Sequence, residues 1–232
     1  IKKDLVNAQK YIEIAKERSP HRPDIWFTLG WIYEILGKSK EAEEAYNQAI
    51  SLTPEYYKAL THLAVIYLKR GDLEKSKKLL TKALKSNPYY VEARFNLAQV
   101  LLKERRPKEA IEHLSAIICK YSPQEEVLKS LGIAHLQLLD YSNAEKYLST
   151  AYAKLSQDDL LSLLAIAYAG IGKYREAEEC IEKLVYKNNT PQTLFNIGNA
   201  YELMKEYNIA KDYYKRVLEK SPNRPDAYAG LG

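Results

Sequence analysis

Prolines recur every 34 residues in the first part of the chain, at Pro20, Pro54 and Pro88. A fixed period of this length constrains the fold strongly, because each unit must be one supersecondary element that buries its apolar side against the next copy. When Pro23 is numbered as position 1, apolar or small residues recur at positions 4, 7, 8, 11, 20, 24 and 27. In the first unit these positions hold Trp26, Leu29, Gly30, Tyr33, Ala42, Tyr46 and Ala49.

These positions predict two helices in each unit. Positions 4, 7, 8 and 11 share one face of a first helix, and positions 20, 24 and 27 share one face of a second. Small residues at positions 8 and 20 allow the two helices to approach closely, and a glycine at position 15, such as Gly37, suits the turn between them. Proline at position 32 ends the second helix. The pattern therefore predicts an all-α fold, an α-α superhelix in which antiparallel helix pairs stack into a solenoid.

The period divides the whole chain. We expect residues 1–232 to form a single solenoid that begins with the second helix of a partial repeat, 1–22, and ends with the start of a further one, 225–232. Six complete repeats lie between these segments: 23–56, 57–90, 91–124, 125–157, 158–190 and 191–224. Since the chain starts without Met and stops within a helical pattern, we expect it to be a piece of a longer repeat array.

The spacing changes in the middle of the chain. Ser156 and Asn189 occupy position 32 in place of proline, and Pro123 comes one place late. These changes predict irregular stacking of the repeats in three places, around residues 118–126, 154–160 and 187–192.

With small and large residues matched at this period, the chain resembles the tetratricopeptide repeat family over essentially its whole length. The resemblance implies a protein that holds other proteins and does not catalyse a reaction. In this family the first helices line a concave groove, into which positions 2, 5, 6, 9, 12 and 13 point. The partner-binding residues that this implies are Phe27, Trp31, His62, Val65, Phe95, Asn96, Gln99, Ile133, Ile166, Phe195, Asn196 and Asn199.

Two kinds of side chain stand out in this set. Exposed aromatic anchors such as Phe27 and Trp31 are typical of protein-binding surfaces, although packing against neighbouring first helices is the alternative. Asn96 and Asn196 match the asparagines with which family members hold a peptide backbone, but asparagine also fills this position without that role. The groove positions carry six acids and four bases, so we expect the basic excess of the chain on its other faces.

Composition and motifs indicate no catalytic chemistry. The net charge of +5, from 35 Lys and Arg against 30 Asp and Glu, is too mild and too dispersed to predict nucleic-acid binding. No apolar run is long enough to cross a membrane. The two cysteines and four histidines lack metal-ligand or disulfide-framework spacing. We therefore predict no catalytic residues, no metal site and no cofactor.

The leading prediction is a protein–protein interaction scaffold that binds a partner peptide or protein segment in its groove. The alternatives are a non-catalytic recognition arm of a larger enzyme, such as a repeat-fused glycosyltransferase, and a module that forms homo-oligomers through exposed repeat ends. No three consecutive repeats supply the complete set of residues that forms the family's carboxylate clamp for chaperone C-termini, so a chaperone co-adaptor function is disfavoured. A cytoplasmic location fits the low cysteine content.

Overall fold

The computed structural model describes residues 2–120, 124–187 and 190–232. Within these ranges the regular secondary structure consists of fourteen helices, and there is no strand. The all-α class predicted from the period is confirmed. The chain divides into two compact units, residues 1–109 (unit 1) and 110–232 (unit 2).

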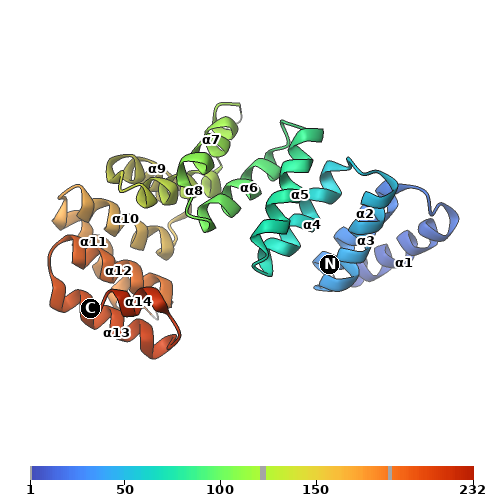
Figure 1. The fold of residues 1–232 in the computed structure, drawn as a ribbon. Coiled ribbons are helices and arrows are strands. Elements are labelled where there is room, and N and C mark those ends of the chain that lie inside the picture. Colours follow the sequence, from blue (N-terminus) through green and yellow to red (C-terminus); the bar gives the residue numbers. More distant parts are fainter. Residues whose placement is uncertain (1, 121–123, 188–189) are drawn as a thin grey trace. The chain divides into compact units, whose positions relative to one another are not determined.

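The helices follow one another as first and second members of pairs (Figure 1). Unit 1 holds α1 (Lys2–Arg18), α2 (Pro23–Ile35), α3 (Ser39–Leu52), α4 (Tyr57–Lys69), α5 (Leu73–Ser86) and α6 (Val91–Lys103). The division between the units falls within α7 (Pro107–Ile118). Unit 2 holds α8 (Glu125–Gln137), α9 (Tyr141–Leu155), α10 (Asp158–Gly170), α11 (Tyr174–Val185), α12 (Pro191–Leu203), α13 (Tyr207–Lys220) and α14 (Pro225–Ala229).

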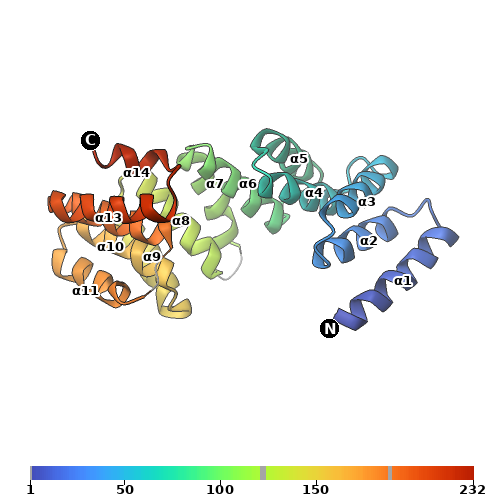
Figure 2. The same ribbon diagram turned by 90° about the horizontal axis from the view of Figure 1, so that it is seen from below.

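In unit 1, α2 and α4 each pack on the second helix of their own pair and on the second helix of the preceding pair. Thus α4 contacts both α5 and α3, and Figure 2 shows the order of α1 to α5 along the unit. The helices meet through residues at the repeat positions and, in α4, also through positions 3 and 10, Ala59 and Ile66. One core cluster joins α2, α3 and α4, and its buried members are Ala42, Tyr46, Ala49, Ala59, Leu63 and Ile66.

In unit 2, α10 is the central helix, since it contacts α8, α9, α11 and α12. Its apolar residues join those of its neighbours in one large cluster, which includes Leu148, Leu161, Leu164, Ile181, Leu184 and Ile197. The short α14 packs against α13, and the buried Ala227 joins Leu194 and Val217 in a smaller cluster.

The turn inside each pair requires a left-handed residue at position 15. Gly37, Gly71 and Gly172 have φ of 74°, 84° and 79° there, which glycine adopts without steric cost. The other three pairs with a complete second helix place Arg105, Leu139 and Lys205 in the same conformation. Since a side chain at positive φ is strained, the turn geometry is imposed by the packing of the two helices.

A close approach between the two helices of a pair explains the glycine at position 8. A Cβ atom on Gly30 would lie 2.6 Å from the Tyr46 ring, and one on Gly198 would lie 2.6 Å from the Tyr214 ring. The repeats with alanine at position 8 carry leucine or isoleucine opposite it: Ala64 with Leu80, Ala98 with Leu114, and Ala165 with Ile181. Positions 8 and 24 are therefore matched in size in these five repeats, whereas in the fourth repeat a glycine, Gly132, faces a leucine, and its Cβ would lie 2.4 Å from Leu148.

The connection from α9 to α10, in which Ser156 occupies position 32 in place of proline, is short. Four residues join α3 to α4 and α5 to α6, whereas two residues, Ser156 and Gln157, join α9 to α10. Ser156 adopts a left-handed conformation with φ of 47°. Of the other two places where irregular stacking was predicted, residues 121–123 and 188–189, which include Pro123 and Asn189, lie outside the described residues.

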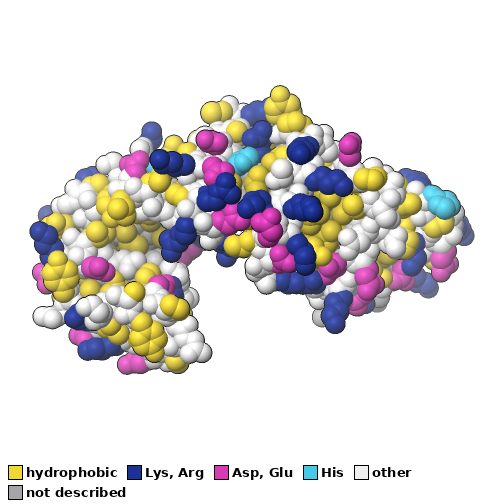
Figure 3. Space-filling view, in the orientation of Figure 1, with side chains coloured by type: hydrophobic (Ala, Val, Ile, Leu, Met, Phe, Trp, Pro, Cys, Tyr) yellow, Lys and Arg dark blue, Asp and Glu magenta, His cyan; other side chains and the backbone are white. Residues whose placement is uncertain are grey.

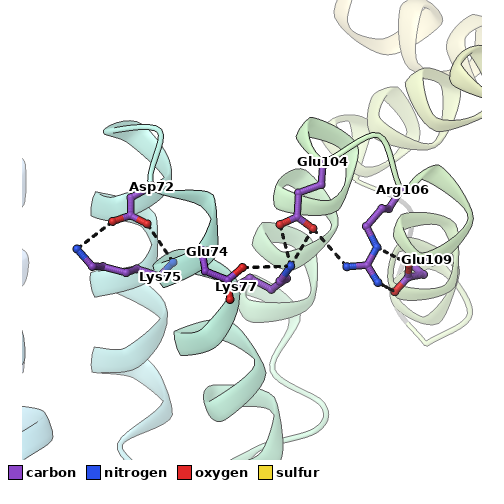
Figure 4. A network of polar contacts seen from close by, with 7 residues as sticks. All are labelled: Asp72, Glu74, Lys75, Lys77, Glu104, Arg106 and Glu109. Atoms are coloured by element: carbon purple, nitrogen blue, oxygen red, sulfur yellow. Dashed lines mark hydrogen bonds and ion pairs between the residues drawn. The ribbon is translucent and has the colours of Figure 1, made fainter.

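Two ion pairs link successive helix pairs in unit 1, and the acidic and basic partners are exchanged between them. Glu43 at position 21 pairs with Arg70 at position 14 of the next repeat, at 2.5 Å. One repeat later, Lys77 occupies position 21 and pairs with Glu104 at position 14, at 2.8 Å (Figure 4). The hydrogen bond from Lys77 lowers the pKa of Glu104. The same contact is thus made with the charges exchanged.

Candidate protein-interaction surface

The candidate surface in unit 1 is the first-helix face, formed by positions 2, 5, 6, 9, 12 and 13 of α2, α4 and α6. Its centre is a polar cluster that joins three helices. The Tyr46 hydroxyl of α3 donates to Glu34 Oε2 of α2 at 2.9 Å, and His62 Nδ1 of α4 lies 3.0 Å from the same oxygen. Lys69 Nζ is 3.4 Å from the other carboxylate oxygen. The cluster therefore ties the first helices of two successive repeats together.

The charges of this cluster follow from its hydrogen bonds. The bonds with His62 and Tyr46, together with the nearby Lys69, lower the pKa of Glu34 to about 2, against the opposing effect of burial. Burial and the Glu34 charge raise the pKa of Tyr46. At neutral pH, Glu34 is consequently ionised and Tyr46 is a neutral donor.

Phe27 packs beside this cluster and is half-buried. Its ring centroid lies 5.3 Å from that of His62, 5.5 Å from that of Tyr56 and 5.9 Å from that of Tyr46. These edge-on and tilted contacts fix the ring. Much of the Phe27 side chain is therefore buried by packing between helices, which is the alternative to binding a partner.

Trp31 differs from Phe27, since 48% of its surface is exposed. Ile35, one turn further along α2, is 47% exposed, so the two residues lie next to each other on one face of the helix. Beside them, Glu34 and Lys69 supply charged groups. This arrangement is an exposed apolar pair with a polar border, which is the usual composition of a protein-binding surface.

The remaining residues predicted in unit 1 are half-buried on α4 and α6. This group is Val65, Phe95, Asn96 and Gln99. The Asn96 side-chain amide donates to the Glu92 carbonyl of its own helix at 2.7 Å.

In unit 2 the predicted asparagines are engaged within the protein. Asn196 is only 5% exposed, and its amide nitrogen donates to Ser162 Oγ at 2.9 Å, which links α12 to α10. Its side-chain oxygen accepts from Gln192 at 2.9 Å. Asn199 Oδ1 accepts from the Tyr214 hydroxyl at 2.8 Å. Both asparagines therefore connect helices of the repeat stack.

The apolar residues predicted in unit 2 are also partly covered. Ile133 is half-buried, and Ile166 packs against the central core cluster. The Phe195 ring lies 5.6 Å from that of Tyr214 and has the Arg224 guanidinium 4.7 Å above it. Unit 2 thus offers no apolar pair on the predicted positions that is as exposed as Trp31 and Ile35.

The residue pattern missed the role of position 12. Glu34 and Glu202 both lie within 2.9 Å of a position-24 tyrosine hydroxyl, Tyr46 and Tyr214 respectively. In both repeats position 8 is glycine, which makes room for the ring. The joint occurrence of glycine at 8, glutamate at 12 and tyrosine at 24 in the first and sixth repeats was the available signal.

Two further properties concern the described residues only. They contain no group of three or more His, Cys, Asp or Glu side chains placed to hold a metal ion. Among their helices, none combines the length and the apolar character needed to span a bilayer.

Stacked helix pairs built on the same repeated residue positions define a helical-repeat protein. Comparison with known families specifies which one. The model described as "Tetratricopeptide repeat protein 21 ARM repeat" matches residues 3–112, and the model described as "Tetratricopeptide repeat" matches residues 191–224. Both models describe repeats rather than a catalytic domain. The chain belongs to the tetratricopeptide repeat family.

Similar proteins agree with this assignment. The tetratricopeptide repeat-containing protein trd-1 of Caenorhabditis elegans is 32% identical over 85 residues, which are 37% of this chain and 11% of that protein. Anaphase-promoting complex subunit 3 of Schizosaccharomyces pombe is 24% identical over 202 residues, or 85% of this chain and 30% of that protein. The chain thus spans less than a third of either relative.

The fold is that of a solved tetratricopeptide repeat protein from Parabacteroides merdae. The two superpose with a TM-score of 0.68 at 21% identity, over 99% of this chain and 92% of the other. The tetratricopeptide solenoid fold predicted from the sequence is therefore confirmed.

Proposed function

We propose that this chain is a non-catalytic protein-interaction scaffold whose first-helix face in unit 1 binds a segment of a partner protein. The observation that carries the proposal is the exposed pair of Trp31 and Ile35 on α2. Large apolar side chains with about half their surface in water are candidates for the few residues that dominate an interface. A subunit of a multiprotein complex among the relatives, anaphase-promoting complex subunit 3, supports a scaffold role.

The polar cluster behind this pair prepares the surface for binding. Glu34 is held by Tyr46, His62 and Lys69, so the backbone of α2 beneath Trp31 and Ile35 is tied to α3 and α4. A surface that is rigid before binding loses little conformational entropy when a partner docks. The Phe27 ring packs against Tyr46 and His62 of this cluster, so we assign the main anchor to Trp31 and Ile35 instead.

A peptide library displayed on phage and selected on the whole chain tests the proposal. Selected peptides would be synthesised, and their dissociation constants measured by fluorescence anisotropy for wild type and for Trp31→Ser/Ile35→Ser. Loss of a central tryptophan anchor costs about 2 kcal/mol or more, so we expect binding to weaken by roughly thirtyfold or more. Because both side chains are exposed, the variant should keep the helicity of the wild type.

The matched control is Tyr174→Ser/Tyr207→Ser, which removes two apolar side chains of similar exposure, 48% and 57%, from unit 2. This control should bind the peptides as the wild type does. If the peptides bind the Trp31/Ile35 variant with unchanged affinity, the first-helix face of unit 1 is not their binding surface.

A further inference from the structure

Among the described helices, the second helix α5 carries the largest net positive charge. α5 contains five lysines and one glutamate, so it alone carries a net charge of +4, compared with +5 for the whole chain. By contrast, α3, the second helix of the preceding pair, contains one lysine and three glutamates. In Figure 3, Lys and Arg side chains gather over the part of unit 1 that holds α4 to α6.

The lysines of α5 lie opposite its buried side. Ser76, Leu80 and Ala83 are buried against the neighbouring helices. Lys78, Lys82 and Lys85, which follow one another at spacings of four and three residues, are all exposed on the opposite side. We name these three residues the lysine face of α5.

The carboxylates near this face are already engaged with other cations (Figure 4). The pairs are Lys75 with Asp72 at 3.0 Å, Lys77 with Glu74 at 3.5 Å and with Glu104 at 2.8 Å, and Arg106 with Glu109 at 2.6 Å. None of the described carboxylates pairs with Lys78, Lys82 or Lys85. The charge of the lysine face is therefore not neutralised within this part of the chain.

Such an arrangement has an energetic cost in the isolated chain. Like charges three or four residues apart on a helix repel and destabilise it. The helix dipole favours a lysine in the last turn, which accounts for Lys85, but it does not favour Lys78 and Lys82 in the middle of α5. A partner that supplies negative charges at the same spacing would remove this repulsion.

We propose that the lysine face of α5 is a docking surface for an acidic helical segment of another protein, with Asp or Glu at spacings of three and four residues. A helix of 14 residues such as α5 is about 21 Å long, which matches a partner helix of about four turns. Lysines on one helix and carboxylates on another then meet as opposed rows, in the manner of the charged flanks of a coiled coil.

The composition of this surface favours protein over nucleic acid. α5 has no aromatic residue on which a base could stack and no arginine to hold a phosphate with two hydrogen bonds. The exposed Glu41 and Glu44 of the acidic α3 would repel a phosphate backbone that extended over the preceding pair. A helical segment confined to α5 avoids these charges.

The lysine face belongs to a second helix, whereas the proposed peptide-binding surface consists of first helices. The two proposals therefore fail independently, and each has its own variant. The triple variant Lys78→Gln/Lys82→Gln/Lys85→Gln removes three charges from α5 and keeps residues of good helix propensity. The control Lys40→Gln/Lys183→Gln/Lys211→Gln removes the same net charge at exposed lysines of α3, α11 and α13.

The probe is a fluorescein-labelled 21-residue helical peptide with Glu at positions i, i+3, i+4 and i+7, measured by anisotropy at 50 mM salt. A peptide with Gln in place of Glu, a single-stranded DNA 12-mer and phosphatidylserine vesicles are measured in parallel. We expect the Glu peptide to bind at least tenfold more weakly to the α5 variant than to the wild type and the control variant.

Equal binding of the Glu peptide to the α5 variant and the control would overturn the proposal, because net charge alone would then explain the affinity. Absence of binding to the wild type would overturn it as well. Tighter binding of the DNA or the vesicles than of the Glu peptide, lost in the α5 variant, would assign the face to a different class of partner and so refute the protein assignment.

Discussion

The substitution Gly30→Ala tests whether positions 8 and 24 are matched in size. The added Cβ would lie 2.6 Å and 2.7 Å from two atoms of the Tyr46 ring, which is fully buried. Since the ring is rigid and close-packed, it can make room only by displacing its neighbours. The same displacement would pull the Tyr46 hydroxyl away from Glu34.

The expected magnitude combines three effects. Overpacking in a core costs about 1–3 kcal/mol, and the loss of the Tyr46 hydrogen bond costs about 1 kcal/mol. The higher helix propensity of alanine offsets about 1 kcal/mol of this destabilisation. We therefore expect Gly30→Ala to lower the free energy of unfolding by about 1–3 kcal/mol, and Tyr46→Leu alone to lower it by about 2–4 kcal/mol through the cavity that it creates.

The double variant Gly30→Ala/Tyr46→Leu shows whether the two residues are coupled through their sizes or destabilise the fold independently. It reproduces the pairing of Ala64 with Leu80 in the second repeat, so its cost should be smaller than the sum of the single costs by about 1–2 kcal/mol. Urea unfolding followed by far-UV circular dichroism measures the three variants, with unchanged m values as the requirement for comparison.

The control for this cycle is Gly37→Ala. A Cβ there would have no atom within 4 Å, and its cost of about 1 kcal/mol arises from the positive φ alone. It should therefore add to the cost of Tyr46→Leu without coupling. Additive costs for Gly30→Ala and Tyr46→Leu as well would refute the size-matching argument.

Two further predictions concern the turns and the polar cluster. Lys205 has φ of 65°, a conformation that glycine adopts more readily than other residues. Lys205→Gly should therefore raise the free energy of unfolding by about 0.5–1 kcal/mol, whereas Lys205→Ala should not. Equal effects of the two substitutions on the urea midpoint would contradict this. The pKa of Glu34 in the folded protein is about 2, below its ordinary value of 4.5. The stability that the Glu34 charge contributes is therefore fully present above pH 4.5 and is lost as the pH falls from 4.5 towards 2. The difference in Tm between wild type and Glu34→Gln should therefore shrink over this interval, and a difference independent of pH would show that the Glu34 charge does not stabilise the fold.

The sequence by itself determined the repeat and the family. The 34-residue period, the small residue at position 8 and the glycine or proline at the turns are local features, and each specifies a helix, a turn or a close contact within one repeat. The starts of α2 at Pro23 and α4 at Tyr57 follow directly from them. Because every repeat is built in the same way, a residue that departs from the pattern at a single position does not change the fold that the pattern predicts.

Only the tertiary structure decided which groove positions remain accessible. Trp31 and Asn196 both occupy positions that the family pattern assigns to the groove, yet Trp31 is half exposed and Asn196 is buried against Ser162. The difference depends on which side chain the neighbouring repeat places opposite each residue, and this side chain lies about one repeat away in the chain. A repeat pattern fixes the direction of a side chain from its own helix, whereas exposure and hydrogen bonding depend on the packing between helices, which no single repeat contains.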